Sequence, residues 1–117
     1  MPTMRLLPEI LGERREANRV ELSLHVPADL VYFEGHFPGL PILPGVVQID
    51  WSIKLARPRL PVRGEFAAAE NLKFLSIVAP GARLMLLLDL AADTRLGFNY
   101  FFGNKTFSSG TLLFGVP

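Results

Sequence analysis

The sequence predicts an α+β fold, in which an antiparallel β-sheet of about five to six strands wraps around one long central helix. Two observations lead to this prediction. Only one stretch has apolar residues at helical spacing, and the segments on either side of it alternate between apolar and polar residues, as half-buried strands do. The 117 residues are enough for one hydrophobic core, so we expect a single domain over residues 1–117.

The strands are predicted from their alternation and from the turns between them. In the first clear strand, apolar Val20, Leu22 and Leu24 alternate with polar Glu21 and Ser23. Residues 5–13 fit either an earlier strand or a short helix, and residues 83–91 are so apolar that we expect a strand covered on both faces. Strands are expected at residues 19–26, 65–77 (with a bulge), 83–91, 96–102 and 105–116, with turns at Pro80-Gly81 and Gly103-Asn104.

The long helix is predicted at residues 46–56, directly after Pro44-Gly45 and before Pro58. Its central stretch is apolar nearly all round, so we expect other elements to wrap it. The residues at three- and four-residue spacing that should form its buried stripe are Val46, Ile49, Ile53 and Ala56.

Composition narrows the possible classes of function. The formal net charge is only +1, which gives no support for binding to nucleic acid or to an anionic membrane. The chain has no cysteine, which excludes disulfides, thiolate metal sites and cysteine nucleophiles. The first residues do not resemble a secretory signal, and no apolar run is long enough to span a bilayer, so a soluble cytoplasmic protein is expected. Nine phenylalanines are hard to bury in one small monomer, so we expect a dimer or a larger assembly.

The segment from Gly35 to Gly45 is where we expect the chemistry. It holds three prolines and three glycines, a mixture that predicts a rigid loop of defined shape leading into the helix. His36 lies inside this loop. Most single histidines are structural, and His25 is expected to be one of these because it shares the polar face of its strand. The surroundings of His36 favour a catalytic role instead.

Two groups on the helix complete the candidate site. The backbone N–H of Gly45 has no partner within the helix and no side chain in front of it, so it can donate to an oxygen that gains negative charge. Asp50 lies about 7 Å further along the helix axis, between apolar Ile49 and Trp51. A solvated or backbone-bonded aspartate is the alternative. Burial would raise its pKa and suit it to deliver a proton.

The sequence contains the motif His-Phe-Pro-Gly-x-Pro-x-x-Pro-Gly from His36 to Gly45, followed fourteen positions after the histidine by Asp50. This resembles the active-site motif of bacterial 3-hydroxyacyl-acyl-carrier-protein dehydratases of fatty-acid synthesis. Residues 73–81 also resemble the strand and Pro-Gly turn of that family. The acid is an aspartate, as in the branch of the family that can also isomerise the new double bond, whereas the commoner branch has glutamate. The short chain and the run from Val46 to Trp51 are closer to the small dehydratases encoded in aryl-polyene and related polyketide-like clusters.

The resemblance implies a hotdog fold and a homodimer, or a dimer of dimers, whose sheets join into one continuous sheet. It places the active site at the dimer interface, with the histidine from one subunit and the acid from the other. It further implies a substrate carried on the phosphopantetheine arm of acyl carrier protein, with no metal or redox cofactor. In the dehydration that such enzymes catalyse, the resemblance makes His36 the general base. The Gly45 N–H would stabilise the thioester oxygen, and Asp50 would orient or protonate the departing hydroxyl.

Further residues are candidates for contact with the substrate or the carrier. For four aromatic residues, a place in an acyl tunnel competes with plain core packing: Tyr32, Phe33, Trp51 and Phe74. Substrate contact is also predicted for Phe37, Pro44 and Val46. A basic cluster is either a docking patch for an acidic carrier protein or a solvated helix end: Lys54, Arg57, Arg59 and Arg63.

Two other functions remain open from the sequence. The first is a hotdog thioesterase, which would hydrolyse the same thioester. The second is a non-catalytic subunit that binds acyl carrier protein beside an active paralogue. The presence of both His36 and Asp50 favours dehydration.

Overall fold

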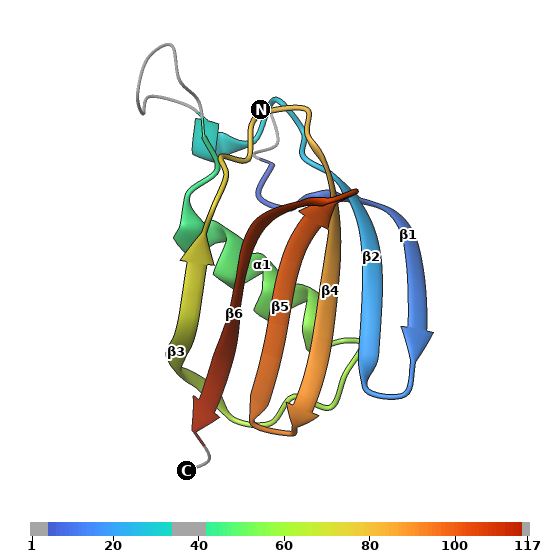
Figure 1. Ribbon diagram of the computed structural model, residues 1–117, viewed down its shortest axis with the longest axis vertical. Helices are drawn as coiled ribbons and strands as arrows, with labels where there is room; N and C mark the ends of the chain where they lie inside the picture. The colour runs from blue at the N-terminus through green and yellow to red at the C-terminus, as the bar shows by residue number, and fades with distance from the viewer. Residues whose placement is uncertain (1–4, 34–41, 116–117) are drawn as a thin grey trace.

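In the computed structural model, the structure describes residues 5–33 and 42–115. Six antiparallel strands form one sheet in the order β1-β2-β4-β5-β6-β3, and one helix packs on it (Figure 1). The elements are β1 (Glu9–Glu16), β2 (Arg19–His25), a 3-10 turn η1 (Val31–Phe33), α1 (Gly45–Ala56), β3 (Glu65–Phe74), β4 (Arg83–Ala92), β5 (Arg95–Phe102) and β6 (Lys105–Gly115).

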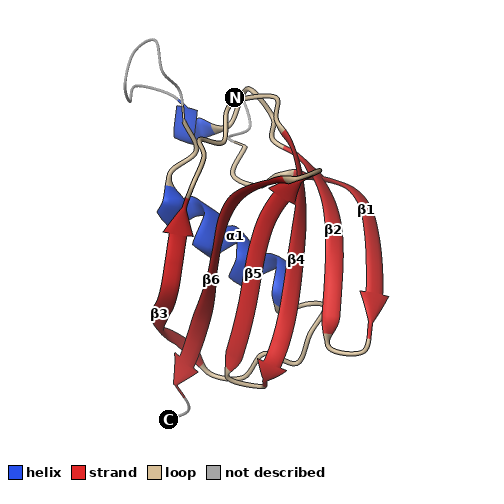
Figure 2. Cartoon of the chain, viewed as in Figure 1, coloured by secondary structure: helices blue, strands red, loops and turns tan. Residues whose placement is uncertain are grey.

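The sheet curves around the helix, which confirms the predicted α+β fold. Figure 2 shows α1 on one face of the sheet, crossing behind β6, β5 and β4 in that view. Alternate residues of β2, β4 and β5 are buried beneath the helix, as the period of a strand requires. Residues 5–13, for which the sequence allowed either a strand or a short helix, contain the start of strand β1, which begins directly after Pro8. No helix within the described ranges is long and apolar enough to cross a membrane.

One row of paired residues runs across five strands on the inner face. Leu22 pairs with Leu86, and Leu86 pairs with Tyr100. Tyr100 pairs with Ser108, which pairs with Phe74 at the end of β3. The row therefore changes from apolar to polar and ends on an aromatic ring, and the first turns of α1 lie over its polar part.

Strand β3 forms one edge of the sheet and is irregular, as the predicted bulge requires. Its pairing with β6 shifts register twice, and Asn71 at the second shift has a positive φ of 53°. All but one of its ten residues are exposed. This edge and the segment after it carry large exposed apolar side chains, namely Phe66, Leu72, Phe74, Leu75 and Ile77.

The buried face of the helix differs from the predicted stripe. Val46 is 72% exposed, and Ile49 and Ile53 are only half-buried, so of the predicted stripe only Ala56 is fully buried. Spacing alone does not say which of two neighbouring stripes faces the sheet. Here the sheet side includes two polar residues that hydrogen bonds satisfy, and its members are Val47, Gln48, Trp51, Ser52, Leu55 and Ala56.

Strand β4 also differs from its prediction, because only one of its faces is covered. Leu84, Leu86 and Leu88 are buried, whereas Asp89 on the outer face is exposed and Leu87 is half-buried. The apolar outer residues made the strand look covered on both sides. In the single chain the helix protects one side only.

Candidate active site

The helix α1 begins at Gly45, with Pro44 as its N-cap. The Pro44 carbonyl accepts hydrogen bonds from the N–H groups of Val47 (3.1 Å) and Gln48 (3.3 Å). Proline has no side-chain acceptor, so no side chain caps this end. No residue in the described ranges accepts a hydrogen bond from the Gly45 N–H. The positive end of the helix dipole and a backbone donor therefore coincide at this position, as the sequence predicted.

The ring of Phe74 lies directly against Gly45. A Cβ atom at position 45 would lie 2.7 Å from Cζ of Phe74 and 2.8 Å from its Cε1, closer than van der Waals contact allows. The glycine is thus needed for this aromatic packing as well as for an unobstructed N–H. The structure thus brings together Gly45, predicted as the backbone donor, and Phe74, predicted as a candidate for the acyl tunnel.

A pocket of about 440 Å³ opens beside this contact. The end of β3 and the extended segment after it form one wall, and the start of α1 forms the other. Most of its surface is apolar, which suits an acyl chain. Its lining residues are Ile42, Leu43, Pro44, Gly45, Gln48, Phe74, Leu75, Ser76, Ile77 and Val78.

Gln48 is a buried polar residue of the pocket wall, with only 3% of its surface exposed. Its Nε2 donates to the Leu43 carbonyl at 3.2 Å, and its Oε1 accepts from the Ser108 hydroxyl at 2.6 Å. Its backbone carbonyl accepts from the hydroxyls of Tyr100 at 2.7 Å and Ser52 at 2.9 Å. Burial raises the pKa of the Tyr100 phenol well above its ordinary value, so this group stays protonated and can donate.

Asp50 lies on a different side of α1 from the pocket. Asp50 follows Gly45 by five residues, so its side chain leaves the helix about 140° around the axis from the position of Gly45. The Asp50 side chain is 46% exposed and forms an ion pair with Lys54, with Oδ2 and Nζ 2.9 Å apart. The hydrogen bond and the charge of Asp50 raise the pKa of Lys54. The expectation that Asp50 is buried is therefore not met in the single chain.

Asp50 nonetheless has apolar neighbours on its helix face. Val46, which is exposed, and Ile49 and Ile53, which are half-buried against the core cluster, share this stripe, so the chain covers it only in part. A second surface laid over the stripe would remove the carboxylate from water.

The predicted residues His36 and Phe37 lie outside the described residues, so their roles stay predictions. His25, expected to be structural, bonds through Nδ1 to the Glu9 carboxylate at 2.6 Å.

The predicted tunnel aromatics separate into two groups. Phe74 lines the pocket, whereas Trp51 is fully buried in the core, where its Nε1–H donates to the Leu6 carbonyl at 2.9 Å. Tyr32 and Phe33 of η1 are half-buried and pack against the core cluster. Of the further predicted contacts, Pro44 lines the pocket and Val46 is an exposed residue of the first turn.

Each residue of the predicted basic cluster has a partner within the chain. Lys54 pairs with Asp50, and Arg63 lies 3.8 Å from Asp93. Arg57 donates to the Gly64 carbonyl and lies over the Phe114 ring, and Arg59 pairs with Glu13. These contacts use part of the charge that a docking patch would offer, and docking stays a prediction.

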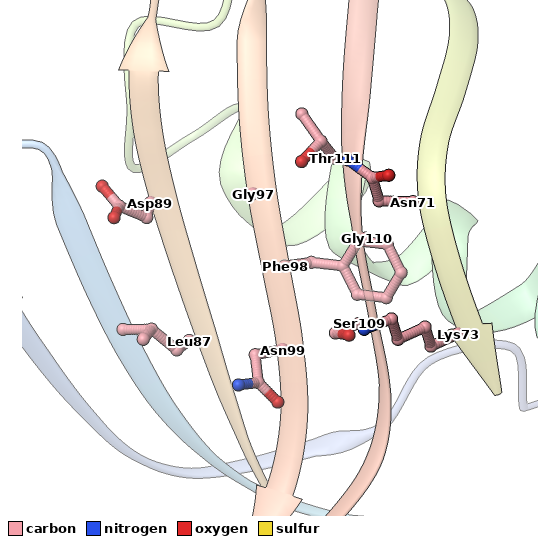
Figure 3. Close-up of a pocket in the computed structure, with 10 residues that line it drawn as sticks. All are labelled: Asn71, Lys73, Leu87, Asp89, Gly97, Phe98, Asn99, Ser109, Gly110 and Thr111. Atoms are coloured by element: carbon pink, nitrogen blue, oxygen red, sulfur yellow. The ribbon is translucent and has the colours of Figure 1, made fainter. Parts of the chain in front are cut away.

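A second hollow, of about 310 Å³, lies on the outer face of the sheet (Figure 3). Gly97 forms part of its wall, together with polar side chains that include Asn99, Ser109 and Thr111. None of the residues that we predicted to carry chemistry lines this hollow.

Sequence reasoning missed the polar residues beneath the pocket. The signal was present in α1, where Gln48 and Ser52 stand four residues apart and so share one face of a helix. Asp50 and Lys54 form the same spacing on another face. The four residues do not make one polar stripe because one pair is turned inward and the other outward.

Comparison with known proteins identifies the family of this chain. Residues 12–111 match the model of the ApeI-like family, described as ApeI dehydratase. The 3-hydroxyacyl-acyl-carrier-protein dehydratase FabZ of Fusobacterium nucleatum is 35% identical over 85 residues, covering 68% of this chain and 60% of that protein. The FabZ of Legionella pneumophila strain Philadelphia 1 is 36% identical over 74 residues, 55% of this chain and 49% of that protein. The chain thus spans about half to three fifths of the length of these curated relatives.

Two solved structures share the fold over nearly their whole length. The dehydratase heterocomplex ApeI:P from Xenorhabdus doucetiae contains a chain with a TM-score of 0.83 and 31% identity, covering 91% of this chain and 96% of that one. An uncharacterized protein from Erwinia carotovora subsp. atroseptica has a TM-score of 0.77 and 36% identity, covering 92% and 94%. With a family match over most of its residues and a six-stranded sheet curved around one helix, this chain is a hotdog-fold member of the ApeI-like dehydratase family.

Proposed function

We propose that this protein removes water from a (3R)-3-hydroxyacyl thioester to give the trans-2-enoyl thioester. The observation that carries the proposal is the backbone donor of Gly45, a residue that ends the histidine motif, begins α1 and lines an apolar pocket. A thioester carbonyl held there would meet a donor and the positive end of a helix dipole while its acyl chain lies against apolar residues.

The proposed reaction divides among three groups. His36 takes the C2 proton as general base, since neutral imidazole is abundant near neutral pH. The Gly45 N–H stabilises the negative charge that develops on the thioester oxygen. Asp50 of a second chain orients or protonates the departing 3-hydroxyl, directly or through one water. The protons balance over one turnover, because the proton that Asp50 gives to the hydroxyl is replaced by the one that His36 takes from C2, so the net loss is one molecule of water.

A second copy of this chain is the proposed source of Asp50. Two apolar surfaces are incompletely covered in the single chain: the edge of β3, with Phe66 and Leu72 exposed, and the helix stripe of exposed Val46 and half-buried Ile49 and Ile53. An antiparallel copy of β3 would satisfy the open edge and extend the sheet. Covering the helix stripe would place Asp50 in less polar surroundings, as its role requires.

The proposed substrate form is an acyl group on acyl carrier protein, in fatty-acid or aryl-polyene-type synthesis. The FabZ relatives carry acyl carrier protein in their names, which supports this. We place the protein in the cytoplasm, where a chain of 117 residues without cysteine fits a reducing compartment.

A second arrangement has an observation in its favour. The similar chain from Xenorhabdus doucetiae belongs to a dehydratase heterocomplex. Pairing with a different hotdog chain in place of a second copy would leave the fold and the pocket unchanged, and it would make activity depend on that partner.

Mass spectrometry of the intact acyl carrier protein tests the proposed function. The purified protein is incubated with 3-hydroxyacyl carrier protein, and loss of one water from the carrier-bound acyl group is expected. Unmodified carrier with a free thiol would instead identify a thioesterase. No change in the carrier's mass would contradict a self-sufficient dehydratase, and activity on adding a paralogous hotdog chain would then assign this chain to a heteromer.

A further inference from the structure

The four hydrogen bonds around Gln48 join three separate elements of the fold. Ser108 lies on β6 and Tyr100 on β5, as direct cross-strand neighbours, and both point to the helix side of the sheet. Gln48 and Ser52 lie on the facing side of α1. The hydroxyl oxygens of Ser52 and Tyr100 also lie 3.1 Å apart, so either hydroxyl can donate to the other as an alternative to the Gln48 carbonyl. The result is a polar network beneath the first turns of the helix.

The network extends to the backbone that leads into the helix. Gln48 Nε2 donates to the carbonyl of Leu43, and the N–H of Leu43 donates to the Val78 carbonyl at 2.9 Å. Both polar groups of Leu43 are thus engaged, two residues before Gly45. On the other side of Gln48, its Oε1 is tied to Ser108 on the sheet. The Gln48 side chain therefore connects the sheet to the segment that sets the direction of the Gly45 N–H.

This connection replaces the usual means of holding a helix start. Most helices are fixed at the N-terminus by a side chain of the N-cap residue, and the Pro44 N-cap has none that can bond. An apolar residue at position 48 would fill the space, but it would leave the Ser108 hydroxyl and the Leu43 carbonyl without these partners. A buried polar network that is fully satisfied holds its members in one arrangement.

We propose that Gln48, held by Ser108 and Tyr100, is a positioning residue that aligns the Gly45 N–H with the reacting thioester oxygen. Gln48 acts through the backbone of residues 43–45 and not by touching the reacting atoms. The inference rests on the proposed role of Gly45 in dehydration and adds the device that keeps this donor in place. Tyr100 and Ser108, which lie far from Gln48 in the sequence, thereby belong to the functional unit.

The positioning role predicts a specific kinetic result. A donor that is displaced by a fraction of an ångström still permits the substrate to bind but stabilises the transition state less. We therefore expect Ser108→Ala and Gln48→Met to lower kcat by roughly tenfold or more with KM nearly unchanged. Ser108→Thr keeps the hydroxyl and should retain more activity than Ser108→Ala.

A matched control separates positioning from loss of stability. Leu88→Val removes one methylene from the inner face of β4, outside the row that carries Tyr100 and Ser108. It should lower the melting temperature to a similar extent and leave kcat unchanged. If Leu88→Val and Ser108→Ala lose kcat alike at equal loss of stability, the network is merely structural and the inference is wrong.

A second readout does not need turnover. In the NMR spectrum of the 15N-labelled protein, the Gly45 amide resonance should shift in Ser108→Ala and stay in place in Leu88→Val. An unmoved Gly45 resonance in Ser108→Ala would overturn the inference even if the wild type dehydrates its substrate. A wild type that fails to dehydrate, with the Gly45 resonance shifting as expected, would overturn the proposed function and leave the positioning of this N–H intact.

Discussion

Gly45 serves two contacts at once, because one side of its Cα faces the Phe74 ring and the residue also lines the pocket. Its φ is not in the left-handed region, so an alanine at this position has no backbone penalty. Any cost of adding a methyl group therefore comes from Phe74, whose ring atoms lie within 3.2 Å of the position that the new Cβ would occupy. Phe74 is 48% exposed, so its ring can move outward at modest cost in stability.

We expect Gly45→Ala to lower kcat/KM by roughly tenfold or more while the melting temperature changes by only a few degrees, because the displaced ring alters the pocket wall. Steady-state kinetics and thermal unfolding would measure the two effects. Gly12→Ala is the matched control, since its Cβ would meet the nearest atoms at an ordinary 3.7 Å. Adding Phe74→Ala to Gly45→Ala should relieve the clash. Wild-type kcat/KM in Gly45→Ala would contradict this reading of the contact.

The β1–β2 hairpin shows how a short element can carry strain. Its two-residue loop is Ala17-Asn18, and Ala17 has a φ of 50°, a conformation in which a Cβ is unfavourable. Glycine adopts this conformation without that penalty, and two-residue hairpin turns favour it at the first position.

We expect Ala17→Gly to raise the free energy of unfolding by about 1 kcal/mol. This is the relief of backbone strain in the turn minus the cost of the greater freedom of glycine in the unfolded chain. Chemical denaturation would measure this change. Ala92→Gly is the control, because Ala92 is an exposed strand residue without a positive φ and its loss should destabilise the protein. A destabilised Ala17→Gly would show that this turn does not carry the strain.

How far the sequence predicts the elements depends on whether the signal is local. The helix at residues 46–56 and the turns at Gly81 and Gly103 were predicted correctly, because prolines, glycines and apolar spacing are local properties. The prediction of which face of α1 is buried was wrong, because hydrogen bonds from β5 and β6 make Gln48 and Ser52 suitable for burial. No local pattern reveals a partner that lies 60 positions away, as Ser108 does from Gln48.

The candidate site was predictable to the same extent. The motif predicted that Gly45 stands at the helix start, because this depends on consecutive residues, whereas the pocket beside it also needs residues 74–78. The expected burial of Asp50 depends on a surface that one chain does not contain. A sequence pattern can report the requirements of an assembly, whereas the fold of a single chain shows only the part that this chain supplies.

The whole molecule is therefore expected to be active only as an assembly that shares its sites between chains. Asp50 and Gly45 point to different sides of one helix, so one chain is not expected to present both to the same thioester. Alone, His36→Ala and Asp50→Asn should each lose at least about a hundredfold in kcat while remaining folded dimers, since each removes one positioned acid or base.

Mixing these two inactive variants should restore activity. In a mixed dimer, one site takes His36 from the Asp50→Asn chain and Asp50 from the His36→Ala chain, so it is complete, while the other site lacks both groups. If the subunits pair at random, half of the dimers are mixed and about a quarter of all sites are complete, so co-expression should recover about a quarter of the wild-type kcat. Co-expressing the double variant with either single variant is the control and should recover nothing, because no complete site can form. Failure of the mixed dimers to recover activity, with their formation verified by two affinity tags, would mean that His36 and Asp50 act within one chain. In that case the ion pair with Lys54 would have to open before Asp50 could reach the substrate, and the incomplete burial of Val46, Ile49 and Ile53 would need another explanation.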